Sequence, residues 1–242
     1  MTASDLYIRV RDKEGRLYSD NMVRNLPDVP LDHPLRAEWC ARAASMRRLM
    51  DHIRRLPPHP ARLLDVGCGN GWLSHHLCAL RGLSVWGVDR AGPELTQAAG
   101  IFGAGNLMFL EADVFQPPVP QSSFDVIVMA SVIQYFPDLP RLIQSLQLLL
   151  RPGGEIHVID SPLYDAAGLA AAQKRTEAYY AALGFPDMSA HYFHHTYAEL
   201  RPFAPIYLHR PDSLPARVSR RIGRPQSPFP WVLIRSPLKF VV

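Results

Sequence analysis

The sequence contains few cysteines and no long apolar run. Its three cysteines, Cys40, Cys68 and Cys78, are an odd number without a C-x-x-C spacing, so neither a disulfide framework nor a zinc site is indicated. No stretch approaches the roughly 18 apolar residues that a membrane helix requires. The segment 1–20 is charged and lacks the apolar core of a secretory signal. We therefore expect a cytoplasmic protein with no membrane partner and no metal.

The composition is that of an ordinary globular chain with a modest basic excess. Its 242 residues, 48% hydrophobic and 20% charged, are enough for one domain with its own core. The formal net charge is +4, and residues 201–242 contain eight Lys or Arg against the single acid Asp212. A solvated basic tail is the simpler explanation of this excess, and contact with RNA or an anionic substrate is the alternative.

Short apolar runs alternate with longer segments of helical periodicity through the middle of the chain. A helix is expected over 35–56, where apolar residues recur every three or four positions ahead of two prolines. Strands are then expected at 62–68, 83–89, 107–113, 124–133 and 155–161, with helices at 70–82, 92–103 and 138–150 and a turn at 151–154. This alternation predicts a mostly parallel sheet covered by helices on both faces.

The flanking segments have a different pattern. Residues 1–34 are expected to be irregular, with a hairpin around Glu14 and Gly15. Helices at 165–183 and 195–203 and strands at 203–211 and 229–237, the strands separated by an Arg- and Pro-rich loop, follow the core. A single domain is therefore expected to contain a cap segment (1–34), a core (35–160), a lid or acceptor-binding insertion (161–200) and a C-terminal strand pair (201–242).

The segment 63–74, LLDVGCGNGWLS, joins an expected strand to an expected helix through three glycines. Backbone N–H groups at such a turn lie beside the positive end of the helix dipole, where they can bind a ligand. The dinucleotide fingerprint G-x-G-x-x-G fails because its third position holds Trp72 or Ser74. A P-loop is excluded because no lysine occurs between Lys13 and Lys174.

The glycines instead follow D-x-G-x-G-x-G over 65–71, which resembles the first motif of class I S-adenosylmethionine-dependent methyltransferases, in particular the small-molecule, type 11-like members. Asp89 follows the next strand, where that family binds the ribose hydroxyls, and Asp113 follows the strand after it, beside the adenine. Segments 124–138 and 148–158 resemble the family's fourth strand and the turn into its fifth.

The resemblance covers roughly residues 63–161 and implies both the fold and the cofactor. The implied fold class is α/β, with a Rossmann-like, seven-stranded, mostly parallel sheet, helices on both faces and a C-terminal antiparallel hairpin. The implied cofactor is S-adenosyl-L-methionine. The implied cofactor-binding residues lie on the glycine loop and at the ends of the following strands: Asp65, Gly67, Cys68, Gly69, Gly71, Asp89, Arg90, Ala112, Asp113, Val114, Met129, Ala130 and Gln134.

Some of these positions also have a purely structural explanation. Asp65 could equally hold the loop by accepting backbone N–H groups. Cys68 is expected to contribute only its backbone, and Gln134 could equally be a packing residue.

The chemistry implied by the resemblance is an in-line displacement at a sulfonium methyl group. Such a reaction depends on alignment and exclusion of water, with a general base needed only when the nucleophile is protonated. The catalytic candidates are His194 and His195, in the histidine-rich segment 190–197, and Tyr135 after the fourth strand. Histidine suits proton removal because it titrates near neutrality. The alternative is that this segment packs against the sheet.

Residues 129–132 lack the Asn- or Asp-Pro-Pro-aromatic loop of enzymes that methylate base amines. Aromatic residues are frequent in the segments that build the acceptor pocket in this family: Tyr7, Tyr18, Trp39, Tyr164, Tyr179, Tyr180, Phe185, Tyr192 and Phe193. We therefore expect methylation of an O or N atom of a small organic acceptor. The alternatives are RNA methylation through the basic C-terminal segment, an NAD-dependent oxidoreductase, and an inactive methyltransferase-like binding protein.

Overall fold

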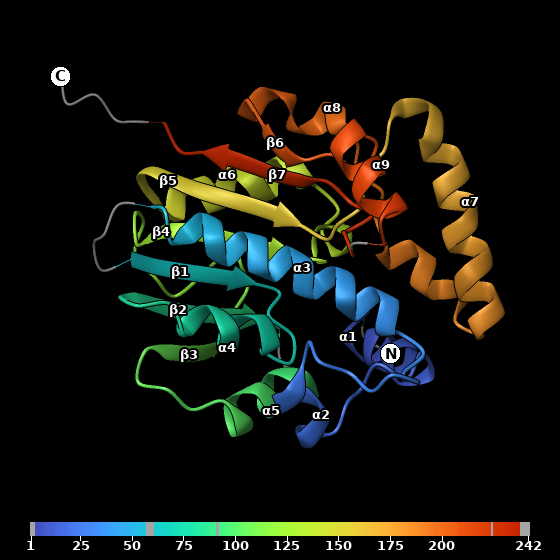
Figure 1. Cartoon of the computed structure of the whole chain (residues 1–242), viewed down its shortest axis with the longest axis horizontal. Coiled ribbons are helices and arrows are strands. Elements are labelled where there is room, and N and C mark those ends of the chain that lie inside the picture. Colours follow the sequence, from blue (N-terminus) through green and yellow to red (C-terminus); the bar gives the residue numbers. More distant parts are fainter. Residues whose placement is uncertain (1–2, 57–60, 91, 224, 238–242) are drawn as a thin grey trace.

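A seven-stranded sheet forms the centre of the computed structural model, which describes residues 3–56, 61–90, 92–223 and 225–237. The strand order is β3-β2-β1-β4-β5-β7-β6 (Figure 1). Strands β1 to β5 pair in parallel, and β7 is antiparallel to both β5 and β6. The strands are β1 (Ala61–Val66), β2 (Leu83–Asp89), β3 (Leu107–Glu111), β4 (Phe124–Ala130), β5 (Leu150–Ile159), β6 (Ile206–His209) and β7 (Trp231–Arg235). The expected fold class is confirmed.

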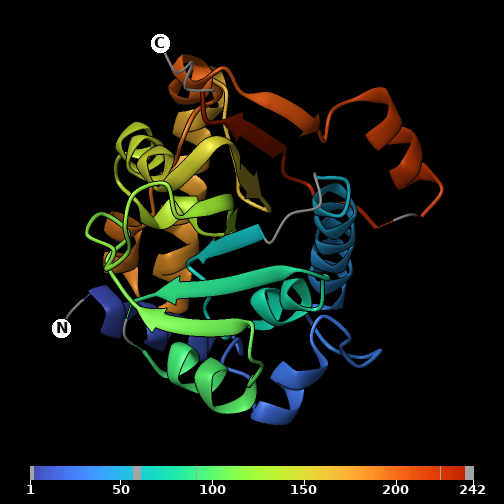
Figure 2. The same ribbon diagram turned by 90° about the vertical axis from the view of Figure 1, so that its left-hand side faces the viewer.

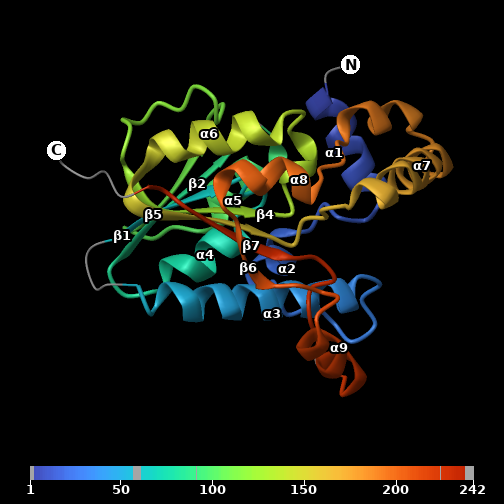
Figure 3. The same cartoon turned by 90° about the horizontal axis from the view of Figure 1, so that it is seen from above.

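Helices cover both faces of this sheet. The α-helices are α1 (Ala3–Lys13), α2 (Asp20–Asn25), α3 (Arg36–Ile53), α4 (Trp72–Cys78), α5 (Pro93–Ile101), α6 (Leu139–Leu149), α7 (Ala166–Leu183), α8 (Tyr197–Leu200) and α9 (Leu214–Arg221). Three short 3-10 helices are η1 (Ile133–Tyr135), η2 (Pro186–His191) and η3 (Arg201–Phe203). Helices α3 and α4 lie on one face, and α6 and α8 lie on the other (Figure 3).

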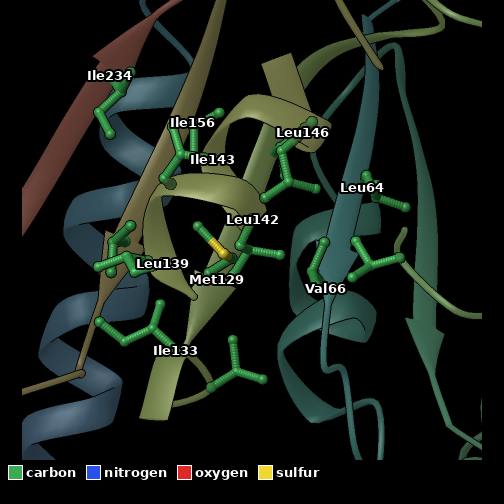
Figure 4. Close-up of a cluster of buried hydrophobic side chains, with 14 of the residues drawn as sticks. Leu64, Val66, Met129, Ile133, Leu139, Leu142, Ile143, Leu146, Ile156 and Ile234 are labelled. Atoms are coloured by element: carbon green, nitrogen blue, oxygen red, sulfur yellow. The ribbon is translucent and has the colours of Figure 1, made fainter. Parts of the chain in front are cut away.

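The core is divided by the sheet into two layers. On one side, the apolar residues of α6 recur at three- and four-residue spacing, so Leu139, Leu142, Ile143 and Leu146 all face the sheet and are fully buried (Figure 4). On the other side, α3 and α4 both pack against the second face of the sheet, over β1, β2 and β4. Because both faces are covered, the central strands are apolar on both sides.

The structure corrects several expectations for single elements. Residues 1–34 contain α1 and α2 where irregular chain and a hairpin were expected. Strand β5 begins at Leu150 and includes residues 151–154, and its register with β4 shifts between Phe124 and Val126. Helix α9 lies in the loop expected between the last two strands. No helix in the described part of the chain has both the length and the apolar character needed to cross a bilayer.

Helix α1 packs against the C-terminal part of α7 and against η2, beyond the edge of the sheet where the parallel strands end. Leu6 and Val10, four residues apart on α1, are buried against Tyr180 of α7 and Met188 of η2. Figures 1 and 3 place α1 beside α7 on this side of the molecule. We call α1, α7 and η2 together the cap.

Candidate active site

Two adjoining cavities lie under the cap, where β1 ends. The strand order reverses here because the neighbours of β1 are β2 on one side and β4 on the other, and open α/β sheets bind ligands at such a switch point. The first cavity, about 360 Å³, is lined by the glycine loop, the end of β2, residues 112–114 and α1. The second, about 910 Å³, is lined mainly by α3, α7 and the loops after β4 and β5. Both are lined by Tyr7, Gly67, Gly69, Glu94, Ser131 and Tyr135.

The glycine loop brings backbone close to the cavities because its glycines adopt conformations that other residues avoid. Gly67 and Gly69 have φ of 70° and 52°, in the left-handed region that favours glycine. A Cβ atom on Gly67 would lie 2.2 Å from Cγ2 of Val132. A Cβ atom on Gly69 would lie 3.8 Å from the Glu94 carboxylate and meet nothing closer, so this backbone faces the open cavity.

Asp89 at the end of β2 holds the loop and faces the first cavity. Its Oδ2 accepts a hydrogen bond from the Gly69 N–H at 2.7 Å, and its Oδ1 accepts one from the Arg90 N–H at 2.7 Å. Burial raises the pKa of Asp89, and these two backbone donors oppose that shift. A carboxylate oxygen can accept more than one hydrogen bond, so both oxygens retain capacity for a ligand hydroxyl.

The other expected residues of the first cavity are also on its wall. Arg90, Ala112, Asp113 and Val114 all line it. Asp113 is held in place because its Oδ1 accepts a hydrogen bond from the N–H of Phe115 at 2.9 Å. The structure therefore brings the ends of β2 and β3 together around this cavity, as the sequence indicates.

Four expected cofactor residues line the second cavity, namely Asp65, Cys68, Ala130 and Gln134. Asp65 is 2% exposed and accepts a hydrogen bond from Ser74 Oγ at 2.6 Å. Burial raises the pKa of Asp65 to about 7, although the Ser74 hydroxyl acts to lower it. The amide nitrogen of Gln134 donates to the Ser131 carbonyl at 2.7 Å. Its amide oxygen is buried without a partner among the described residues.

Two expected cofactor residues line neither cavity. A Cβ atom on Gly71 would lie 2.6 Å from Phe109 and 2.8 Å from Ala98, so this glycine lets α5 and β3 pack against the loop. Met129 is fully buried in the core beneath α6 (Figure 4). Its alternation along β4 places its side chain on the α6 face of the sheet.

Of the three catalytic candidates, only Tyr135 lies on a cavity wall. Its ring packs edge-on against Tyr7, with centroids 5.2 Å apart, and it lines both cavities. Burial raises the pKa of Tyr135, so its hydroxyl stays protonated near neutral pH.

Neither His194 nor His195 is among the residues that line the two cavities, although each contacts residues that do. Nε2 of His195 lies 3.0 Å from the Ile133 carbonyl oxygen and 2.9 Å from that of Phe136, and its Nδ1 lies 3.2 Å from the Glu199 carboxylate. The Nε2 of His194 lies 2.9 Å from Thr176 Oγ1. The geometry favours the alternative that this segment packs against its neighbours.

Asp160 is a cavity residue that the sequence reasoning did not identify. It follows β5, has φ of 51° and lines the second cavity. Its Oδ1 accepts a hydrogen bond from Ser45 Oγ at 2.7 Å, and its backbone oxygen accepts one from Ser131 Oγ at 2.9 Å. Burial raises its pKa, opposed by Ser45 and Ser227. An acid at the end of a fifth parallel strand was the signal that could have identified it.

Arg11 is a second residue that the sequence reasoning missed, because α1 was not expected. It lines the second cavity, and its Nη2 lies 3.4 Å from Oε1 of Glu94. Its Nε is buried and has no hydrogen-bond partner among the described residues. A buried guanidinium with an unused donor beside Gly67 and Gly69 is suited to bind an anionic group.

A cluster with the residue types of a metal site lies elsewhere, between α3 and β5. His52, Glu155 and His157 bring their ligand-type atoms within 4.8 Å of one another. However, the Trp231 indole N–H, which can only donate, lies 3.1 Å from Nδ1 of His157. The hydrogen of neutral His157 is therefore on Nε2, which faces Glu155 at 3.3 Å. Within the cluster His52 Nε2 and Glu155 form a hydrogen bond of 2.7 Å, and the cluster does not offer Nε2 of His157 as a metal ligand.

A glycine loop after β1, a carboxylate after β2 and a cavity between them define a class I methyltransferase fold and site. Comparison with known proteins agrees: residues 40–202 match the family model described as a methyltransferase domain, and the chain belongs to that family. The resemblance drawn from the sequence is confirmed at the level of the family, which is that of methyltransferases and not of NAD-dependent oxidoreductases.

Curated relatives match over part of their length. A ubiquinone biosynthesis O-methyltransferase of Xylella fastidiosa (strain 9a5c) is 34% identical over 117 residues, which are 45% of this chain and 46% of the relative. A 27-O-demethylrifamycin SV methyltransferase of Amycolatopsis mediterranei (strain S699) is 30% identical over 135 residues, 53% of this chain and 50% of the relative. The chain thus spans about half the length of the curated relatives it matches.

Solved structures share the fold at low sequence identity. The geranyl diphosphate C-methyltransferase of Streptomyces coelicolor A3(2), solved with Mg²⁺, geranyl diphosphate and S-adenosyl-L-homocysteine, has a TM-score of 0.57 at 19% identity, covering 86% of this chain and 85% of that one. The CurJ carbon methyltransferase has a TM-score of 0.61 at 12% identity, covering 93% and 61%. These matches extend the shared fold over most of the chain.

Proposed function

We propose that this protein transfers a methyl group from S-adenosylmethionine to an oxygen atom, or alternatively a nitrogen atom, of a small organic acceptor. The observation that carries the proposal is the common wall of the two cavities, where Gly67, Gly69, Ser131 and Tyr135 contribute to both. Because these residues line both cavities, a ligand in one cavity would lie next to a ligand in the other, as an in-line displacement requires.

The first cavity has groups suited to an adenosyl ligand. Asp89 offers acceptor capacity for two ribose hydroxyls, and Asp113 and Val114 lie where the adenine would be held. Gly69 leaves the backbone accessible because a Cβ atom there would face open space. When bound, S-adenosylmethionine supplies an electrophilic methyl group on a sulfonium.

Arg11 is our candidate for the carboxylate end of that cofactor. Its unpartnered Nε and its long, 3.4 Å contact to Glu94 leave donors available. Guanidinium groups form strong, charge-assisted hydrogen bonds to carboxylates. Glu94, which lines both cavities, would orient Arg11 and could accept from the cofactor's amino group.

The second cavity is suited to an aromatic or lipophilic acceptor that also carries polar groups, because its wall combines tyrosines with charged side chains such as Arg16, Glu38 and Arg175. Its volume of about 910 Å³ exceeds that of the first, and its wall includes five tyrosines besides Tyr7: Tyr135, Tyr164, Tyr179, Tyr180 and Tyr192. Tyrosine presents a large apolar surface with one polar end. Several relatives are named O-methyltransferases, which supports oxygen as the acceptor atom.

Asp160 is our candidate for the proton acceptor when the acceptor atom is a hydroxyl oxygen. Ser45 donates to its Oδ1, and Ser227 also hydrogen-bonds its carboxylate. Because each carboxylate oxygen can accept more than one hydrogen bond, Asp160 keeps capacity to accept the hydroxyl proton. The Ser131 hydroxyl ties the Asp160 backbone to the wall that both cavities share. This proposal replaces His194 and His195, neither of which lines either cavity. The cytoplasmic location expected from the sequence stays a prediction.

The test is calorimetric titration with S-adenosylhomocysteine and NAD. We expect micromolar binding of S-adenosylhomocysteine and none of NAD. Asp89→Ala should weaken the former by about 1–3 kcal/mol, because charge-assisted hydrogen bonds to the ribose and the order of the glycine loop are both lost. The control is Asp51→Ala, an exposed carboxylate on α3 that forms an ion pair with Arg54. Equal affinity of Asp89→Ala and the unaltered chain would rule out the ribose assignment.

A further inference from the structure

Helix α9 exposes an apolar stripe to solvent. Leu214, Val218 and Ile222, at intervals of four residues, are 74%, 56% and 60% exposed, and this spacing places them on one side of the helix and the turn that follows it. Ala216, on the opposite side, is 3% exposed. Figures 2 and 3 show α9 projecting from the body of the protein. The apolar stripe therefore points away from the rest of the chain.

Arginines lie alongside this stripe. Arg217 and Arg221 are exposed and form no ion pair within the described residues. The segment 210–224 contains five arginines, Arg210, Arg217, Arg220, Arg221 and Arg224, against the single acid Asp212. The exposed surface of α9 thus combines aliphatic side chains with the positive charges of Arg217 and Arg221.

We propose that α9 binds the surface of an anionic phospholipid membrane. A helix with aliphatic residues on one side, arginines beside them and low overall hydrophobicity lies in the plane of a membrane interface, with its apolar side among the acyl chains and its cations at the headgroups. RNA would use the arginines and leave the aliphatic stripe unexplained. Nucleic-acid surfaces that stack bases carry aromatic side chains, and α9 contains none.

Helix α9 is followed in the chain by residues that line the second cavity. Gln226, Ser227 and Phe229, shortly after α9 in the chain, line that cavity. A membrane bound by α9 would lie near the side of the cavity that these residues form, so a lipophilic acceptor could enter from the lipid. This inference differs from the sequence-based expectation of no membrane partner, and the binding of α9 to lipid does not depend on the proposed methyl transfer.

The test is flotation of the full chain with vesicles. One set contains equal parts of phosphatidylcholine and phosphatidylglycerol, and the other contains phosphatidylcholine alone. Two variants remove the two features separately: Arg217→Glu with Arg221→Glu, and Leu214→Ser with Val218→Ser and Ile222→Ser. Matched controls are Arg47→Glu with Arg55→Glu, which are exposed arginines outside α9, and Leu148→Ser, which is 57% exposed on α6.

We expect the chain to float with the anionic vesicles, each α9 variant to bind them at least about tenfold more weakly, and the controls to bind as the unaltered chain does. The proposal is overturned if anionic vesicles are not bound, if neutral vesicles are bound equally well, or if the α9 variants keep full binding. It is also overturned if only a single-stranded RNA is bound and only the arginine variant loses it. Titration of each variant with S-adenosylhomocysteine tests the proposed function separately.

Discussion

At the scale of single residues, we expect substitution of Asp160 to impair proton transfer and substitution of His194 to leave it unchanged. Asp160 lines the second cavity, whereas His194 does not line it and contacts the cavity residue Thr176. Asp160→Asn should lower kcat by about 10²-fold or more, since general-base catalysis contributes factors of this order. Binding of S-adenosylhomocysteine should be unchanged, because Asp160 lies in the other cavity. Steady-state kinetics with an O-methylated acceptor measure this.

His194→Ala is the matched comparison for Asp160→Asn. We expect its kcat to stay near that of the unaltered enzyme. A large loss of kcat in His194→Ala together with full activity in Asp160→Asn would contradict the assignment and return the histidine to the catalytic role that its sequence context first indicated.

The buried Asp65 carboxyl should make the free energy of unfolding depend on pH. Its pKa is about 7 in the folded protein against an ordinary value of 3.8, so the folded state binds the proton more tightly. The free energy of unfolding should therefore fall as pH rises between about 4 and 7, by up to about 1.4 kcal/mol per pH unit from this group. Asp65→Asn should lack this part of the slope. Urea unfolding across that pH range measures it, with Asp51→Asn as the exposed control.

An Asp65→Asn protein whose stability follows the same pH dependence as the unaltered chain would show that this carboxyl is not the source of the slope. The buried hydrogen bond from Ser74 would then stabilise the carboxylate more than burial destabilises it.

At the scale of secondary-structure elements, Glu155 joins α3, β5 and β7. Its carboxylate lies 2.7 Å from His52 Nε2 on α3 and 3.1 Å from Arg235 Nε on β7. Burial alone would raise its pKa, but hydrogen bonds with His157 and His52 lower it to about 2. Glu155→Gln should therefore destabilise the protein by about 1–3 kcal/mol at neutral pH, because charge-assisted hydrogen bonds are lost.

The destabilisation by Glu155→Gln should depend on pH. A carboxylate with a lowered folded-state pKa adds stability above its ordinary value of 4.5, and this stability is lost as pH falls toward 2. Thermal unfolding should therefore show the two proteins converging below about pH 4. The control is Glu111→Gln at the exposed end of β3. Equal stability of Glu155→Gln and the unaltered chain at neutral pH would contradict this account.

The elements that could be predicted from the sequence are those with a strong apolar period. Strands β1 to β4 and helices α3 and α6 lie within a few residues of their expected ranges, because each has a dense apolar pattern. Helix α7 also lies where it was expected, although only Ala172 and Tyr180 of it are buried. Helices α1 and α9 were missed for the opposite reason. Only Leu6 and Val10 of α1 are buried, and α9 has an apolar stripe that packs against nothing described.

The site residues divide in a similar way. Asp89 and the glycines were identifiable because local spacing alone fixes a loop between a strand and a helix. Asp160 and Arg11 could not be assigned because their surroundings arise from contacts distant in sequence, such as Ser45 with Asp160 across 115 residues and Arg11 with Glu94 across 83. The surroundings of His195 could not be predicted for the same reason, since its partners Ile133 and Phe136 lie 62 and 59 residues away.

At the scale of the whole molecule, the cap is held over both cavities by a small apolar cluster. Leu6 and Val10 of α1 are 4% and 3% exposed and pack against Tyr180 and Met188. Leu6→Ala should loosen α1 by about 2–5 kcal/mol, the usual cost of such a truncation, and leave the sheet intact. Hydrogen exchange should therefore become faster in residues 3–13 and 186–191 and stay unchanged in β1 and β4.

Leu31→Ala, at a side chain that is 83% exposed, is the control for the cap. If Leu6→Ala also speeds exchange throughout the sheet, α1 belongs to the cooperative core and is not a separate cap. The expected division of the single domain into residues 1–34, 35–160, 161–200 and 201–242 stays a prediction.

The central claim is that the cavity beside Asp89 and Asp113 binds the methyl donor and adjoins a separate acceptor cavity. The most direct measurement is a crystal structure of the protein with S-adenosylhomocysteine. The account predicts ribose hydroxyls at the Asp89 carboxylate, the adenine beside Asp113 and Val114, and the carboxylate at Arg11, with the sulfur facing Ser131 and Tyr135. An adenosine moiety bound among the tyrosines of the second cavity, or a ribose with no contact to Asp89, would contradict it.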